Sequence, residues 1–191
     1  MEKEKNYTSI IGLTDRSSIV NKLIVPSLKL SKIVQAKKGV DVGTGGGIPG
    51  LVLAIVCPDK NLYLMEPKKK KVFFLNKVNQ KLNLNNVKIV RGRAEIAGKD
   101  LKFRARFDFA TCRAVGNLNL TVELVLPLLA RGGIYYAEKG SKVNLEVDKS
   151  AEKIKMMGGK IVDITRDNIV VIKKISSTPD NLPRSWNRIV K

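Results

Sequence analysis

The stretch DVGTGGGIPG at residues 41–50 follows one short apolar run and leads directly into another. Its glycines Gly43, Gly45 and Gly47 match a DxGxGxG pattern, in which missing side chains permit a tight turn and let the backbone approach a ligand closely. The run before the glycines has the composition of a strand, and the run after them that of a helix. This order predicts the ligand-binding edge of an open α/β sheet.

Outside this stretch, apolar runs of strand length alternate with longer amphipathic stretches, which predicts βα units over a mostly parallel sheet. The predicted strands are residues 39–42, 62–65, 87–90, 107–112, 134–137, 160–164 and 169–174. The predicted helices are residues 50–57, 69–82, 118–130 and 145–157. The turn around Arg166 and Asp167 is too short for a crossover helix, so the last two strands should form an antiparallel hairpin. A mostly parallel seven-stranded sheet with this ending resembles the Rossmann-like class I methyltransferase fold.

The chain length of 191 residues favours one catalytic domain, and we expect a monomer. We expect a short helical region at residues 1–38, a methyltransferase domain at 39–175 and a basic tail at 176–191. An amphipathic segment at about 17–33 is interrupted by Pro26, which predicts separate helical pieces against the sheet edge. The charged residues 1–5 lack the apolar core of a secretory signal, and no stretch approaches the ~20 apolar residues of a membrane span. We therefore expect a cytoplasmic protein that does not enter membranes.

The charge of the chain indicates its kind of partner. Lysine and arginine number 36 against 17 aspartates and glutamates, a formal net charge of +19. Such an excess favours nucleic acid as a partner over a surface that is merely rich in lysine. The chain has no histidine, which removes the usual proton shuttle and the commonest metal ligand, and we expect no metal.

The residues around the glycines distinguish two classes of nucleotide cofactor. Glu66 ends the next predicted strand, where its carboxylate can accept hydrogen bonds from both ribose hydroxyls of an adenosine. The helix after the glycines opens with Pro49, which has no N–H for a pyrophosphate. The strand before them ends with Asp41, an acid suited to a cationic aminoacyl group. These residues favour S-adenosylmethionine over a dinucleotide.

Two further strand ends should converge on the same crevice. After the third strand, Ala94 and Glu95 could frame an adenine, and the fourth strand runs into Arg113, which we expect to point at the ligand. The fourth strand does not end in the Asn/Asp-Pro-Pro-aromatic tetrad by which some methylases hold an exocyclic amine. The target is therefore not expected to be an exocyclic nitrogen of adenine or cytosine.

Six short motifs together resemble one bacterial family: DVGTGGGIPG, KKKKVFFL at 68–75, LNLNNV at 82–87, RAE at 93–95, FDFATCRA at 107–114 and EKG at 138–140. From about Leu13 to Lys174 the chain resembles the ribosomal RNA small subunit methyltransferase G family, also called glucose-inhibited division protein B. The resemblance implies transfer of a methyl group from S-adenosylmethionine to N7 of one guanine in 16S ribosomal RNA. Whether naked RNA or the assembled small subunit is the substrate stays open.

The resemblance also implies site residues. It places cofactor contacts at Gly43, Ile48, Glu66, Ala94, Glu95 and Arg113, and it places Lys139 near the substrate. Asp41, Gly45 and Gly47 complete the expected cofactor site. Guanine N7 carries a lone pair and no proton, so we expect no general base, and catalysis should rest on proximity and alignment. Because the product guanine gains positive charge, Lys139 and Arg113 are interpreted as phosphate or cofactor anchors.

A run of cations at the start of a helix opposes the helix dipole, so its placement needs another cause. The run at residues 68–71 lies at the mouth of the predicted crevice, which favours contact with an RNA backbone over a merely solvated surface. The expected RNA-contacting residues are Lys68, Lys69, Lys70, Lys71, Arg91 and Lys139.

The segment before the first strand departs from the family pattern. Members usually have Asn-Leu-Thr and then His-x-x-Asp-Ser-Leu there, whereas this chain has GLT at 12–14 and LIVPSL at 23–28. Two alternatives therefore stay open. The protein could methylate another substrate, or it could be a ribosome-associated RNA-binding protein that has lost catalysis.

Overall fold

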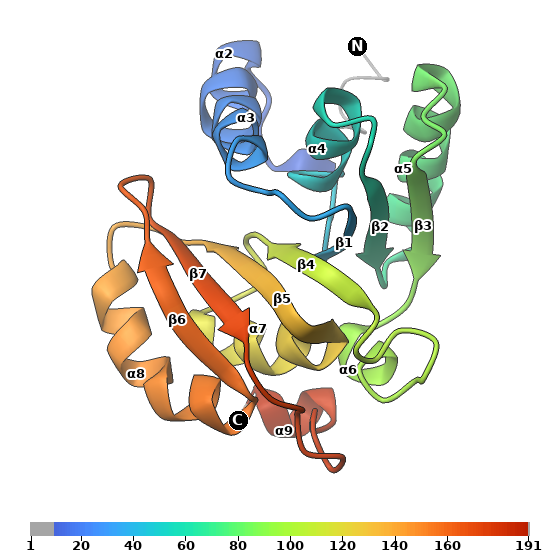
Figure 1. Cartoon of the computed structure of the whole chain (residues 1–191). Coiled ribbons are helices and arrows are strands. Elements are labelled where there is room, and N and C mark those ends of the chain that lie inside the picture. Colours follow the sequence, from blue (N-terminus) through green and yellow to red (C-terminus); the bar gives the residue numbers. More distant parts are fainter. Residues whose placement is uncertain (1–9, 191) are drawn as a thin grey trace.

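The structure is a computed structural model that describes residues 10–190. Within that range, seven strands form one sheet in the order β3-β2-β1-β4-β5-β7-β6 (Figure 1). β7 runs antiparallel to β5 and β6, and the other neighbouring pairs are parallel. The predicted sheet with its terminal hairpin is confirmed. The strands are β1 (Lys38–Val42), β2 (Asn61–Glu66), β3 (Val87–Arg91), β4 (Phe107–Cys112), β5 (Leu129–Glu138), β6 (Gly159–Ile164) and β7 (Ile169–Lys174).

The strand order fixes where a ligand can enter. From β1 the chain moves outward to β2 and β3, and it then returns to place β4 on the other side of β1. Ligands of open α/β sheets bind beyond the carboxyl ends of the strands at such a reversal. The loop after β1 lies at this point, between the ends of β2 and β4.

Helices cover both faces of the sheet (Figure 1). On one face lie α3 (Val25–Ser31), α4 (Gly50–Val56) and α5 (Lys69–Leu82); on the other lie α6 (Ala94–Ala97), α7 (Leu118–Val125), α8 (Val143–Met156) and α9 (Trp186–Ile189). The predicted helix at 118–130 is wrong at its end. Pro127 has no N–H for the helical ladder, so α7 stops, a 3₁₀ turn η2 (Leu126–Leu128) follows, and β5 begins at Leu129.

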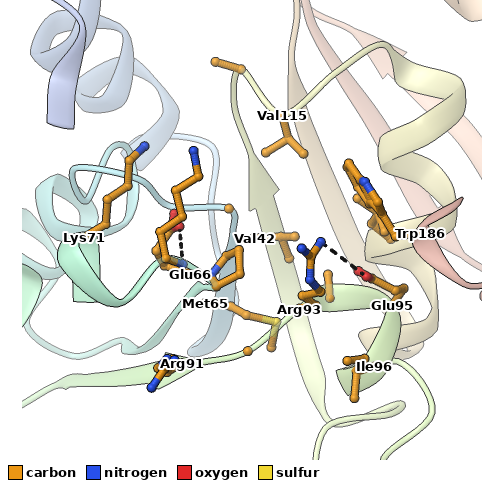
Figure 2. A pocket seen from close by; sticks show the side chains of 17 residues that line it. Val42, Met65, Glu66, Lys71, Arg91, Arg93, Glu95, Ile96, Val115 and Trp186 are labelled. Carbon is orange, nitrogen blue, oxygen red and sulfur yellow. Dashed lines mark hydrogen bonds and ion pairs between the residues drawn. The ribbon is translucent and has the colours of Figure 1, made fainter. Parts of the chain in front are cut away.

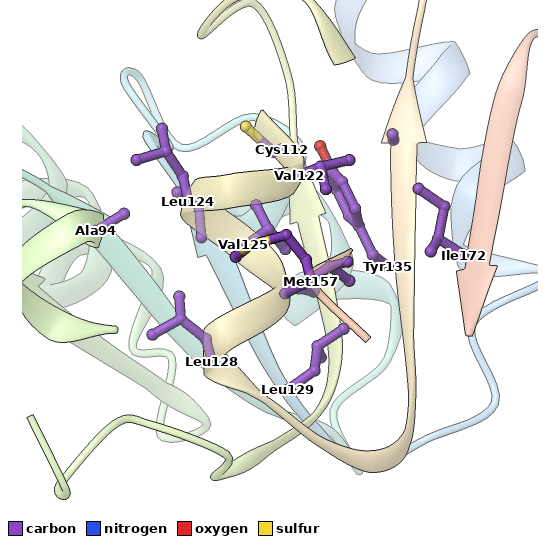
Figure 3. Packing of buried hydrophobic residues seen from close by; sticks show 14 of the residues in the cluster. Ala94, Cys112, Val122, Leu124, Val125, Leu128, Leu129, Tyr135, Met157 and Ile172 are labelled. Atoms are coloured by element: carbon purple, nitrogen blue, oxygen red, sulfur yellow. The ribbon is translucent and has the colours of Figure 1, made fainter. Parts of the chain in front are cut away.

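Each face has its own apolar core. Figure 3 shows α7 packed on the sheet through Val122 and Val125, with the buried ring of Tyr135 beside them. Phe107 belongs to this core, whereas Phe109 belongs to the core under α3 and α4. The pairing register between β4 and β5 shifts between these two phenylalanines, with the extra residues on β5.

The segment before β1 forms helical structure that continues through Pro26. α2 (Arg16–Ile19) leads into a π turn η1 (Val20–Ile24) and then into α3, in whose first turn Pro26 lies. The sequence predicts a break at Pro26, but the helix is instead widened before it. Proline has no N–H to donate to the helical ladder, and the π turn just before it uses i→i+5 in place of i→i+4 hydrogen bonds. The charged residues 1–5 lie outside the described range.

The final residues fold back on the domain as a C-terminal tail, residues 176–190, which ends in α9 (Figure 1). Neither α9 nor the short α6 was among the predicted elements. Between residues 10 and 190, no helix has the length and apolarity that crossing a membrane requires.

Candidate functional site

The glycine-rich loop after β1 turns in the left-handed region of backbone space. Gly43, Gly45 and Gly47 have φ values of +68°, +59° and +92°, which other residues rarely adopt. A Cβ atom on Gly43 would also lie 2.4 Å from Cγ2 of Val115. The loop can therefore keep this shape only with glycine at that position.

The buried carboxylate of Asp41 fixes the glycine-rich loop through hydrogen bonds. Its side chain is fully buried, and its Oδ2 accepts hydrogen bonds from Thr44 Oγ1 at 2.6 Å and from the Gly50 amide at 3.0 Å. Its Oδ1 accepts from Thr111 Oγ1 at 2.8 Å. Burial raises the pKa of Asp41 to about 6, although these hydrogen bonds oppose the rise. The carboxylate links β1, β4 and the start of α4, and it does not line the cavity described below.

Glu66 connects the end of β2 to the same loop. Its side chain is buried, its Oε2 accepts from the Gly45 amide at 3.0 Å, and its Oε1 accepts from the Lys68 amide at 2.9 Å. A carboxylate has about four acceptor sites, so it can accept further hydrogen bonds. Glu66 therefore fixes the loop and still presents acceptor capacity to the cavity.

A cavity of about 900 Å³ opens at the carboxyl ends of β1, β2 and β3 (Figure 2). Ligand pockets typically enclose about 300–1,000 Å³. The predicted residues that the fold brings together in its wall are Gly43, Glu66, Lys68, Lys71, Arg91, Ala94 and Glu95. The cavity lies where the strand order predicts a ligand.

α6 and α9 form the wall opposite Glu66 and Lys71 (Figure 2). Ala94 and Glu95 are buried there, and Arg93 Nη1 lies 3.8 Å from Glu95 Oε1. Trp186 completes this wall, and the guanidinium carbon of Arg93 lies 5.8 Å from its ring centroid. Sequence reasoning missed Trp186, because it belongs to no motif; its one signal is that the chain has a single tryptophan.

The other expected cofactor residues lie outside the cavity wall. Gly45 and Gly47 shape the turn behind it, and Ile48 is half-buried beyond the turn. Arg113 does not point into the cavity, contrary to expectation. Its Nη1 lies 3.3 Å from Glu138 Oε2, and its Nη2 donates to the Lys22 carbonyl, so the guanidinium is held in a separate cavity of about 240 Å³ beside α3.

Lys139 also lies outside the wall of the cavity of about 900 Å³. Its side chain is 5% exposed, and its Nζ donates to the Gly116 carbonyl at 2.9 Å and lies 3.2 Å from Glu146 Oε2. The fold therefore does not bring Lys139 into the wall of that cavity, and its charge is paired with that of Glu146.

Cations rim the cavity at the start of α5. Lys68, Lys69 and Lys70 are exposed, Lys71 is half-buried, and no acidic residue lies in the first turn of this helix. Arg91, at the end of β3, is exposed at the same mouth. The rim therefore presents positive charge to solvent beside the cavity.

Solved structures share the fold. A putative S-adenosyl-L-methionine-dependent methyltransferase of Methanococcus maripaludis superposes with a TM-score of 0.66 at 16% identity, covering 93% of this chain and 92% of that one. M. jannaschii TYW2 in complex with AdoMet gives a TM-score of 0.60 at 17% identity, covering 81% and 77%. At such identities the likeness concerns the fold alone.

Sequence relatives are more specific. The ribosomal RNA small subunit methyltransferase G of Clostridium beijerinckii is 39% identical over 97% of this chain and 82% of the relative. That of Caldicellulosiruptor bescii is 34% identical over 100% of this chain and 86% of the relative. The model of the GidB family, described as rRNA small subunit methyltransferase G, matches residues 2–170. The chain thus belongs to the ribosomal RNA small subunit methyltransferase G family.

Proposed function

We propose that this protein transfers a methyl group from S-adenosylmethionine to N7 of a guanine in 16S ribosomal RNA. The observation that carries the proposal is the cavity in which Gly43 and Glu66 face α6 beneath a rim of cations. Family membership supports ribosomal RNA of the small subunit as the substrate. The cationic rim supports a polyanionic substrate that docks at the cavity mouth.

The donors and acceptors of the cavity fit S-adenosylmethionine better than a dinucleotide. A pyrophosphate needs free N–H groups at a helix N-terminus, but Pro49 has none and the Gly50 amide donates to Asp41. Glu66 keeps acceptor capacity for ribose hydroxyls, and Ala94 and Glu95 would border the adenine. When bound, this cofactor supplies an electrophilic methyl group on a sulfonium.

Methylation of guanine N7 needs no general base from the protein. Guanine N7 attacks through a lone pair and has no proton to lose, so a chain without histidine can support the reaction. The cavity residues bind and align, and effective molarities from alignment are worth about 7–11 kcal/mol in favourable cases. Lysines of the rim would hold the RNA phosphates while the glycine loop and Glu66 hold the cofactor.

The test is methyl transfer from radiolabelled S-adenosylmethionine to small ribosomal subunits that lack the modification, beside naked 16S RNA. We expect label on N7 of one guanine, and a Glu66→Ala variant should transfer far less at the same cofactor concentration. Label on another nucleotide position or on a non-RNA substrate would overturn the N7 assignment. Cofactor and RNA binding without any transfer would favour the noncatalytic alternative.

A further inference from the structure

The C-terminal tail is fixed to the catalytic domain by a buried carboxylate. Glu123 on α7 is 1% exposed, and its two oxygens accept from Arg184 Nε at 2.8 Å and Nη2 at 2.7 Å. The Arg184 amide donates to Glu123 Oε1 at 2.9 Å, and Lys153 Nζ donates to Oε2 at 2.9 Å. Burial raises the pKa of Glu123, but these partners outweigh it and hold the value at about 2. Paired guanidinium bonds of this kind fix geometry as well as position.

A second set of contacts holds the tail two to six residues before Arg184. Arg104 donates to the carbonyl oxygens of Thr178 at 2.7 Å and Leu182 at 2.8 Å, and also to that of Gly98 at 2.7 Å. Leu182 and Ile189 are buried in the core on this face of the sheet. The tail is therefore a packed part of the domain, and the place of α9 beside α6 follows from it.

This anchoring places the Trp186 ring in the cavity wall. Figure 2 shows the ring above Glu95, on the side opposite Glu66 and Lys71. The ring is half-buried, and it lines the same cavity as Gly43 and Ala94. The match to the family model ends at residue 170, so Trp186 lies outside the stretch that this model matches.

We propose that Trp186 packs against the adenine of S-adenosylmethionine, so that the C-terminal tail forms part of the cofactor site. The inference rests on the proposed function for the identity of the ligand. Glu66 would hold the ribose from one wall, while Ala94 and Glu95 border the base at the other. An indole offers a flat apolar surface, and a base stacks on such a ring regardless of its hydrogen-bonding pattern.

The sole tryptophan of the chain makes a direct test possible. We expect tryptophan fluorescence of the wild-type protein to change as S-adenosylmethionine, S-adenosylhomocysteine or methylthioadenosine is added. The midpoint should match the dissociation constant from calorimetry. Trp186→Ala should weaken all three ligands about tenfold, since each contains the base and loss of a stacking ring commonly costs that much. Trp186→Phe should restore most of the affinity.

Arg188→Ala is the matched control, because Arg188 lies exposed on the same helix and outside the cavity wall. It should bind all three ligands as the wild type does, and melting curves should show that every variant is folded. Unchanged affinity in Trp186→Ala, or a loss for S-adenosylmethionine that methylthioadenosine does not share, would overturn the assignment to adenine. If wild-type protein bound none of the ligands, the proposed function itself would fail.

Discussion

Arg113 donates a hydrogen bond from Nη2 to the carbonyl oxygen of Lys22, which joins the end of β4 to the π turn η1. In a regular α-helix this carbonyl would accept from residue 26, but that residue is a proline without an N–H. Glu138 holds the other side of the guanidinium, with Oε2 at 3.3 Å from Nη1. Arg113 therefore positions the N-terminal helices rather than touching the cavity.

The Arg113→Ala variant should loosen those helices while the sheet stays folded. Hydrogen bonds from a charged donor contribute about 1.5–3 kcal/mol, so amides of η1 and α3 should exchange roughly 10- to 100-fold faster. Native-state hydrogen exchange at single-residue resolution measures this. Amides in the middle of β1 serve as the control and should keep their protection. Equal protection of η1 in both proteins would show that the contact does not hold the segment.

Asp41 makes the free energy of unfolding depend on pH. Burial raises its pKa from 3.8 to about 6 in the folded state, so the folded protein binds the extra proton. This contribution to the free energy of unfolding is present below about pH 4 and is lost as the pH rises through about 6. A shift of this size corresponds to ~3 kcal/mol.

The Asp41→Asn variant should lack this term, because its amide does not titrate. Its oxygen can still accept from the Gly50 amide, and its nitrogen can donate to Thr111 Oγ1. Urea unfolding at several pH values from 4 to 7 measures both proteins. The wild-type free energy of unfolding minus that of the variant should fall with rising pH. Taking this difference cancels the effect of the other carboxylates, which both proteins share. A constant difference would argue against a raised pKa.

The sequence predicts local features well and long-range partners poorly. Strand positions and the glycine loop depend on the pattern of neighbouring residues, and the structure has them where expected, except that β5 begins five residues early, at Leu129. The partner of Arg113 lies 91 residues away, and no pattern around Arg113 or Lys22 indicates the contact. Lys139 is similar, since its burial depends on Glu146 from another element. Trp186 lies in the cavity wall because of contacts that are distant in the sequence, among them the pairing of Arg184 with Glu123 across 61 residues.

The Glu66→Ala variant should weaken S-adenosylmethionine by ~1–3 kcal/mol, the usual loss when charge-assisted hydrogen bonds disappear. Part of that loss would come from the loop, because Glu66 also accepts from the Gly45 amide. Glu66→Gln separates the parts, since its amide oxygen can still accept from one backbone N–H. Calorimetry should rank the affinities as wild type, then Gln, then Ala. Equal dissociation constants for all three would remove Glu66 from the cofactor site.

The cationic rim should control RNA affinity separately from cofactor affinity. Lys68 and Lys71 line the cavity, so changing them would alter both, whereas Lys69 and Lys70 lie outside its wall. The Lys69→Gln, Lys70→Gln double variant should bind S-adenosylmethionine as the wild type does but bind 16S RNA more weakly. Each lost phosphate contact should reduce the slope of log affinity against log salt by roughly 0.7–0.9.

The matched control is Lys149→Gln, Lys155→Gln, which removes the same charge from exposed positions of α8, on the other face of the sheet from α5 (Figure 1). Distant charges are screened beyond ~8–10 Å at physiological salt, so this pair should change the slope little. Filter binding of the same RNA from low to moderate salt compares the three proteins. If both double variants lowered the slope equally, net charge rather than a docking rim would explain the RNA affinity. If neither lowered it, the RNA would have to dock elsewhere, with Arg91 and the basic tail as the next residues to change.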